Sequence, residues 1–185
     1  MELPRLRDAV RSCPIAVVVS CLALLGVGVA GIRLSPGLWF DEAYSVAFAS
    51  QSWGAMVEGI RAQEVNNAAY YLLLHLWLQV SGELWWVRGL SVVLAVATSL
   101  AIAWTASLAR RPAVVRWSVL AFAAFWGTWI FTMEARGSML AALLATLFVG
   151  THVRGLADGA SRSEEHTSGL QSPMYLVFRL LLEKK

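Results

Sequence analysis

The sequence predicts an all-α protein, a polytopic transmembrane bundle of several helices. Of its 185 residues, 58% are hydrophobic and only 15% are charged, and the mean hydropathy is +0.61. About a quarter of the residues of a soluble domain are charged, so this composition argues against a soluble protein. The chain also contains nine tryptophans, and tryptophan favours the boundary between membrane and water.

Four segments are predicted to cross the membrane. Residues 14–32 form a run without a charge, and about 20 apolar residues are enough to span a bilayer. Within it, "GVGVAG" (Gly26–Gly31) places small residues at helical spacing, which favours close packing against another helix. The other three segments are 84–109, 117–133 and 138–153.

Residues 33–83 are expected to form an outer loop at the membrane surface. Between 43 and 60, apolar residues recur at roughly helical spacing, the pattern of an amphipathic helix that lies in the interface. The apolar run 70–80 has only 11 residues and is interrupted by His75 and Gln79, so it is typical of a re-entrant or interfacial segment. His75 is expected to be a packed residue with one hydrogen bond.

The arginines favour one orientation of the chain. Cytoplasmic loops are enriched in arginine, and Arg110, Arg111 and Arg116 lie between the second and third predicted spans. If segment 70–80 does not cross, these arginines lie inside with the N-terminal arm; if it crosses, the Arg110–Arg111 pair moves outside. We expect the first arrangement, which gathers six ionisable residues at the outer face: Asp41, Glu42, Glu64, Arg88, Glu134 and Arg136. Ionisable groups at membrane depth usually face a cavity or a substrate path.

The end of the chain differs from the rest. Up to Ser161 every basic residue is an arginine, and both lysines are the last two residues. The segment "RSEEHTSGLQS" (162–172) resembles a translated sequencing adapter, RSEEHTSELQS, from which it differs only at Gly169. We therefore expect residues 1–160 to be the native part and 161–185 a non-native tail; a natural amphipathic tail is the alternative.

The adjacent carboxylates of "LWFDEAYS" (38–45) allow two interpretations. Neighbouring residues of a helix point about 100° apart, so Asp41 and Glu42 need not share one target. In the plain interpretation they are a solvated pair at the start of a helix. In the functional one, one carboxylate accepts a proton or holds a metal while the other anchors an arginine.

This segment resembles the first outer-loop motif of the GT-C superfamily of membrane glycosyltransferases, in particular the protein O-mannosyltransferase and aminoarabinose transferase group. Three further segments are similar to motifs of that group, in the same order: "EVNNAAYYLLLHLWLQVSGE" (64–83), "WWVRGLSVVLAVAT" (85–98) and "MEARGSMLAALLA" (133–145). The likeness covers about Leu38 to Leu147. Asn67 and Ala68 stand where many members have two prolines, and Ser138 stands where they often have tyrosine.

The resemblance implies transfer of a sugar, with inversion, from a polyprenyl-phosphate donor to an acceptor hydroxyl at the outer face of a bacterial inner membrane. It implies that Asp41 is the general base and that Glu42 assists it or binds a divalent metal; no other cofactor is expected. Arg88 and Arg136 are the candidates to hold the donor phosphate, with Glu134 beside Arg136.

Tyr70, Tyr71 and Asn66 are the candidates to line the acceptor pocket. The expected partners are the lipid-linked sugar, the acceptor (a glycan, protein or lipid) and the bilayer, without nucleic acid. Members of the superfamily have further spans, so we expect this chain to be incomplete and inactive by itself. A transporter or lipid-handling subunit, or a membrane scaffold without chemistry, is the alternative.

Overall fold

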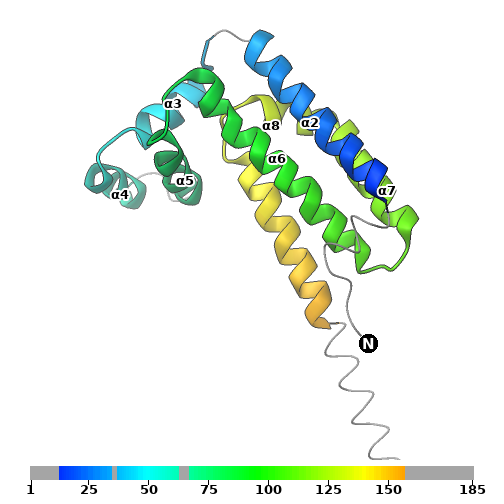
Figure 1. Ribbon diagram of the computed structural model, residues 1–185. Coiled ribbons are helices and arrows are strands. Elements are labelled where there is room, and N and C mark those ends of the chain that lie inside the picture. Colours follow the sequence, from blue (N-terminus) through cyan, green and yellow to red (C-terminus); the bar gives the residue numbers. More distant parts are fainter. Residues whose placement is uncertain (1–12, 35–36, 63–66, 157–185) are drawn as a thin grey trace, which may run out of the picture.

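The computed structural model describes residues 13–34, 37–62 and 67–156, and these residues form helices without a β-strand (Figure 1). The elements in chain order are α2 (Pro14–Leu34), α3 (Phe40–Ala49), α4 (Trp53–Ala62), α5 (Ala68–Leu78), α6 (Leu84–Ser107), α7 (Pro112–Ala124) and α8 (Trp126–Met133). A final helix follows at Ser138–Leu156. The expected all-α architecture is confirmed for the described residues.

Three helices are long and apolar enough to cross a membrane, namely α2, α6 and the final helix. Their bounds agree closely with the predicted segments 14–32, 84–109 and 138–153. Helices α2, α6 and α7 pack against one another and form the long bundle of Figure 1. A core of small and branched side chains lies between them, among them Val17, Ala103 and Val119.

The third predicted span, 117–133, is not one continuous helix. It consists of α7 and α8, which together are apolar enough to cross but are bent by 59° at Phe125. Phe125 has an extended backbone (φ −70°, ψ 125°), which interrupts the helical hydrogen bonds. The indole N–H of Trp129 donates to the carbonyl of Ala123 that the break releases, so the interruption leaves that polar group satisfied.

The predicted surface helix 43–60 is also divided. Helix α3 ends at Ala49, and the N–H and hydroxyl of Ser50 both donate to the carbonyl of Val46. Ser52 then caps the start of α4, because its hydroxyl accepts a hydrogen bond from the N–H of Ala55 in the first turn (3.4 Å). The two serines therefore turn the chain where periodicity alone predicts one helix.

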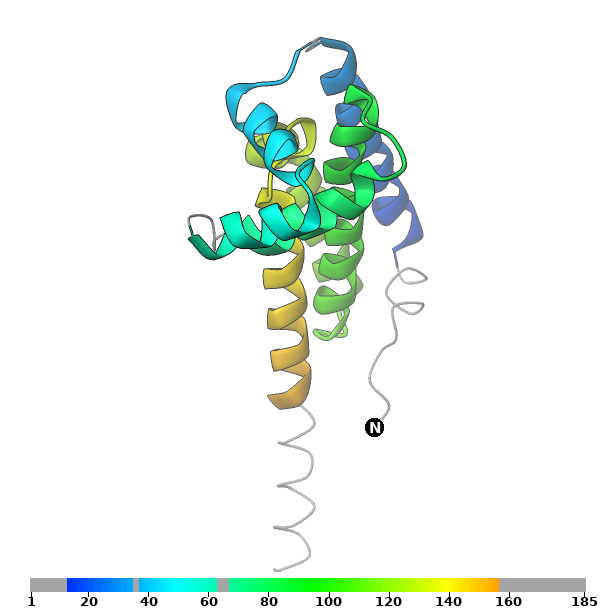
Figure 2. The same cartoon turned by 90° about the vertical axis from the view of Figure 1, so that its left-hand side faces the viewer.

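Helices α3, α4 and α5 form a platform at one end of the bundle. Figure 2 shows α4 and α5 lying across the direction of the long helices. Helix α5 has 11 residues, so it is too short to span, as expected for segment 70–80. The ring of His75 makes two hydrogen bonds where one was predicted. Its Nδ1 lies 2.7 Å from the carbonyl oxygen of Ala49 and holds α5 against the end of α3, and its Nε2 lies 3.5 Å from Nε2 of Gln79.

Two stacked tryptophans close the turn from α5 into α6. The rings of Trp77 and Trp86 lie 4.4 Å apart and nearly parallel. Each indole N–H donates to the carbonyl of the other residue, at 2.8 Å from Trp77 and 2.9 Å from Trp86. This reciprocal pair fixes the direction in which α6 leaves the platform.

Glycines bring α2 close to its neighbours, as the small residues predict. A Cβ at Gly28 would overlap a methyl of Val92, and one at Gly31 would lie 2.6 Å from Cγ of Met133 and 3.2 Å from its Cα. Ser20 adds a polar contact, with its hydroxyl 2.8 Å from that of Ser99 and 3.1 Å from the carbonyl of Val119. Helix α2 is thus held by shape and by hydrogen bonds.

We predict that Gly31→Ala destabilises the protein by about 1–3 kcal/mol, the usual cost of overpacking. The added methyl would have to displace Met133, whose backbone is itself in the way. Gly26→Ala is the matched control, because a Cβ there meets nothing within 4 Å. Equilibrium unfolding in detergent measures both variants, and equal stabilities of the two would contradict the close contact.

Candidate functional site

The ionisable residues of the predicted outer face gather at the platform end of the bundle. Arg88 lies in the second turn of α6, and Glu134 and Arg136 lie in the turn between α8 and the final helix. Asp41 and Glu42 lie in the first turn of α3. Five of the six residues therefore lie close together, as expected. The sixth, Glu64, and the predicted pocket residue Asn66 lie outside the described residues.

Glu42 and Arg88 form a buried, bidentate ion pair. Arg88 Nε donates to Glu42 Oε1 at 3.0 Å, and Nη2 donates to Oε2 at 2.8 Å. The side chain of Glu42 is 0% exposed and that of Arg88 is 2% exposed. Such parallel hydrogen bonds are among the strongest between charged side chains, and they fix orientation as well as distance.

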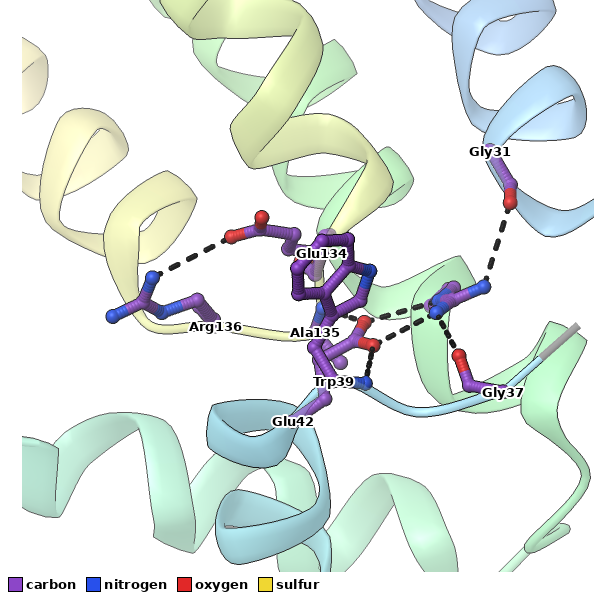
Figure 3. A network of polar contacts seen from close by, with 9 residues as sticks. Gly31, Gly37, Trp39, Glu42, Glu134, Ala135 and Arg136 are labelled. Carbon is purple, nitrogen blue, oxygen red and sulfur yellow. Dashed lines mark hydrogen bonds and ion pairs between the residues drawn. The ribbon is translucent and has the colours of Figure 1, made fainter. Parts of the chain in front are cut away.

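Backbone groups complete the surroundings of this pair (Figure 3). Oε1 of Glu42 also accepts the N–H of Ala135 at 2.8 Å, and Oε2 accepts the N–H of Trp39 at 3.0 Å. Arg88 in turn donates to the carbonyls of Gly31 (3.4 Å) and Gly37 (2.8 Å). One ion pair therefore joins the end of α2, the start of α3, helix α6 and the turn after α8.

The pKa of Glu42 reflects this environment. Burial by itself raises the pKa of the carboxyl, but the hydrogen bonds from Arg88, Ala135 and Trp39 and the positive charge of Arg88 outweigh it and lower the pKa. Glu42 is therefore an anion whose lone pairs are already used. It is placed to hold α3 in position.

Asp41 faces the other way, into a polar pocket. Its carboxylate is 56% exposed and lies 3.1 Å from Nη2 of Arg136, which is 44% exposed. Nη1 of Arg136 lies 3.6 Å from Oε2 of Glu134. The pocket has a volume of about 230 Å³ and is lined by Asp41, Tyr44, Ser45, Asn67, Tyr70, Tyr71, Arg136, Gly137 and Ser138.

The two tyrosines form the buried wall of the pocket. Both are 2% exposed, and the ring of Tyr71 packs 4.6 Å from that of Phe48. Burial raises the pKa of the Tyr70 phenol, against a smaller opposite effect of the nearby Ser91 hydroxyl, so the phenol stays protonated. Its hydroxyl makes no hydrogen bond to another described residue.

Gly137 allows this wall and the turn after α8 to approach each other. A Cβ there would lie 3.1 Å from Oδ1 of Asn67 and 3.3 Å from Cβ of Tyr70. The glycine therefore lies at a close approach between the start of α5 and the turn that carries Arg136. A side chain at this position would enter the pocket.

The predicted site residues thus divide into two groups. Asp41, Tyr70, Tyr71 and Arg136 line the pocket, whereas Glu42 and Arg88 lie beside it in the buried network. The prediction missed five residues of the lining: Tyr44, Ser45, Asn67, Gly137 and Ser138. The first two lie three and four positions after Asp41, so the helical period could have placed them on the same face.

Metal binding by Asp41 and Glu42 stays a prediction that this geometry does not favour. Both oxygens of Glu42 already accept two hydrogen bonds each. Within the described ranges, no three His, Cys, Asp or Glu side chains lie close enough together to hold a metal ion.

Comparison of the chain with protein-family models, with curated proteins and with solved structures finds no match. The likeness to the glycosyltransferase motifs therefore remains a prediction from the sequence.

We predict that Glu42→Gln lowers the free energy of unfolding by about 3–5 kcal/mol, because it leaves the buried guanidinium of Arg88 without its counter-charge. The exposed Glu58 offers a matched control, and Glu58→Gln should change stability by no more than about 0.5 kcal/mol. Unfolding in detergent would measure both. The double variant Glu42→Gln/Arg88→Met should lose less free energy of unfolding than the two single variants lose together. Additive losses would contradict a coupled pair.

We also predict a pH dependence that belongs to Glu42. Because folding lowers its pKa from the ordinary 4.5, the ionised carboxylate stabilises the fold fully above about pH 4.5, and this contribution is lost as the pH falls through the folded-state pKa. The stability difference between wild type and Glu42→Gln should therefore shrink on acidification. A difference that stays constant from pH 7 to below the folded-state pKa would contradict the lowered pKa.

Proposed function

We propose that this chain is part of a membrane glycosyltransferase that moves a sugar from a polyprenyl-phosphate donor to an acceptor hydroxyl, with Asp41 as the general base. The observation that carries the proposal is the different placement of two adjacent carboxylates. Asp41 is half-exposed in a polar pocket. Glu42 is buried beside it, and each of its carboxylate oxygens already accepts two hydrogen bonds. The motif resemblance assigns the base to Asp41, which is the carboxylate that lines the pocket.

The reaction requires such a group. A sugar hydroxyl is a very weak acid, so its oxygen attacks the anomeric carbon more readily when a carboxylate takes the proton as the new bond forms. The bond from the anomeric carbon to the phosphate oxygen breaks, and the lipid phosphate leaves with the electron pair. General-base catalysis typically contributes about 10²–10⁴-fold, and a single displacement inverts the anomeric centre.

In this proposal the two arginines have different roles. Arg136 lines the pocket, so its guanidinium is the group that stabilises charge on the donor phosphate. Arg88 is buried in the ion pair with Glu42 and acts through the position of α3. The tyrosines and Asn67 supply donors and acceptors for sugar hydroxyls.

The pocket is small for the whole donor. Its volume of about 230 Å³ is below the range of about 300–1,000 Å³ that is usual for ligand pockets. It suits the reacting sugar, and the lipid chain would lie along the bundle or against further spans. This is consistent with the expectation that the chain is part of a longer enzyme.

The arginine distribution supports an extracytoplasmic site. Arg110, Arg111 and Arg116 lie around the turn between α6 and α7, at the opposite end of the bundle from the platform (Figure 1). Because arginine-rich loops favour the cytoplasmic side, the pocket would face outward. In a bacterium this is the outer face of the inner membrane.

One observation favours the alternative of a transporter. The break between α7 and α8 resembles the interrupted helices that form ion or substrate sites in transporters. However, the segment 117–133 contains no ionisable residue, and the side chains beside the break, Phe125 and Trp126, are exposed and apolar. The break therefore offers few ligands, and the charges lie at the platform end.

We predict that Asp41→Asn lowers sugar transfer by about 10²–10⁴-fold, because it removes the proton acceptor while the half-exposed side chain contributes little to folding. Glu58→Gln removes a platform carboxylate that does not line the pocket and should leave transfer unchanged. The assay follows labelled sugar from polyprenyl-phosphate donors to hydroxyl acceptors in proteoliposomes, with donor binding measured in parallel.

The protein for this assay is the product of the complete locus, sequenced across the codons for Ala160 to Arg162. Normal transfer by Asp41→Asn would exclude the general-base role. Movement of intact donor across the bilayer without cleavage would favour the transporter.

A further inference from the structure

A second groove lies at the other end of the molecule, between the start of α2 and α7. It has a volume of about 460 Å³ and is lined by Cys13, Pro14, Ile15, Ala16, Val19, Arg116 and Leu120. Six of these seven side chains are uncharged and mostly apolar, and the seventh is a guanidinium. The thiol of Cys13 donates to the carbonyl of Pro112 at 3.1 Å, which holds the two helices together at the edge of the groove.

Arg116 has no acidic partner in the part of the chain that the structure describes. The described acidic residues all belong to the platform end: Asp41, Glu42, Glu58, Glu83 and Glu134. Arg116 is exposed, and its guanidinium carbon lies 5.2 Å from the centre of the Trp117 ring. The indole holds the cation by a cation–π contact without neutralising its charge.

The lining determines what kind of molecule fits. A free inorganic anion would pair with Arg116 but leave the apolar walls exposed to water, whereas a neutral hydrocarbon would leave the arginine without a counter-charge. A ligand that satisfies both carries an anionic group and an apolar chain. The groove lies at the start of α2, which is long and apolar enough to cross a membrane, and at the start of α7, which is so only together with α8. Lipid headgroups lie at the level of a bilayer where such spans end.

We propose that this groove binds one anionic phospholipid, with its phosphate on Arg116 and part of an acyl chain along Ile15, Val19 and Leu120. Basic pockets between helices at the cytoplasmic side suit anionic headgroups. The site is separate from the polar pocket at the platform, and the inference does not depend on glycosyl transfer.

The neighbouring arginines allow a specific site to be distinguished from general attraction. The turn between α6 and α7, which carries Arg110 and Arg111, and the end of the final helix, which carries Arg154, lie at the end of the bundle away from the platform (Figure 1). Any of these arginines would attract an anionic surface. Of the arginines in the described ranges, Arg116 alone lines the groove. Arg111→Gln therefore removes the same charge from the same end without altering the groove, and it is the matched control for Arg116→Gln.

The test is a lipid titration of the full chain in detergent, followed by native mass spectrometry, with phosphatidylglycerol as the probe and phosphatidylcholine as the neutral reference. We expect one phosphatidylglycerol to bind more tightly than phosphatidylcholine. Arg116→Gln should weaken its binding by about fivefold, the factor that corresponds to ~1 kcal/mol per arginine near an anionic surface. Arg111→Gln should change it by less than about twofold.

A second variant tests the apolar part. Val19 is 49% exposed, so Val19→Trp should fill the groove without disturbing the core and should also weaken phosphatidylglycerol binding. Equal losses in Arg116→Gln and Arg111→Gln would show diffuse attraction and overturn the site. Unchanged binding by Val19→Trp, displacement of the lipid by inorganic phosphate alone, or equal binding of phosphatidylcholine would also overturn it.

Discussion

The buried ion pair between Glu42 and Arg88 is the interaction on which the platform end depends. Removing two charges from water is costly, and it is tolerated only where additional hydrogen bonds satisfy the remaining lone pairs and protons. Here the N–H groups of Trp39 and Ala135 supply two of them. Because Arg88 and Ala135 lie 46 and 93 positions from Glu42 in the sequence, the network forms only when those segments have assembled, so its free energy is coupled to the tertiary fold.

The position of Asp41 follows from this constraint. Glu42 lies at the third residue of α3 and accepts the N–H of Trp39 just before the helix, which is one half of a capping box. With Glu42 fixed toward the bundle, its neighbour must point about 100° away around the helix, toward the pocket. The same device that anchors α3 therefore exposes a carboxylate beside the tyrosine wall.

Much of the helix framework could be predicted from composition, and the details of the site could not. Spans such as 14–32 are visible because a bilayer requires long apolar runs. The helix break at Phe125 could not be predicted, because no proline marks it in the sequence. The indole of Trp129 in the following helix stabilises it. The pairing of Glu42 with Arg88 joins residues 46 positions apart, and no local pattern specifies such a contact. The resemblance identified both residues but not that they bind each other.

Arg88 and Arg136 differ most in the free energy that is needed to break their ion pairs. Breaking the buried pair at Arg88 would strand a charge in a water-free site, at a cost of about 3–5 kcal/mol. The pairs of Arg136 are half-exposed, at 3.1 Å and 3.6 Å, and such surface pairs contribute only about 0–1 kcal/mol. An anion that enters the pocket therefore recruits Arg136 at little cost, and Asp41 then loses its cation but keeps its place on α3. The buried pair Glu42–Arg88 and the half-exposed pair Asp41–Arg136 lie next to each other because Asp41 and Glu42 are adjacent residues of α3 whose side chains point in different directions.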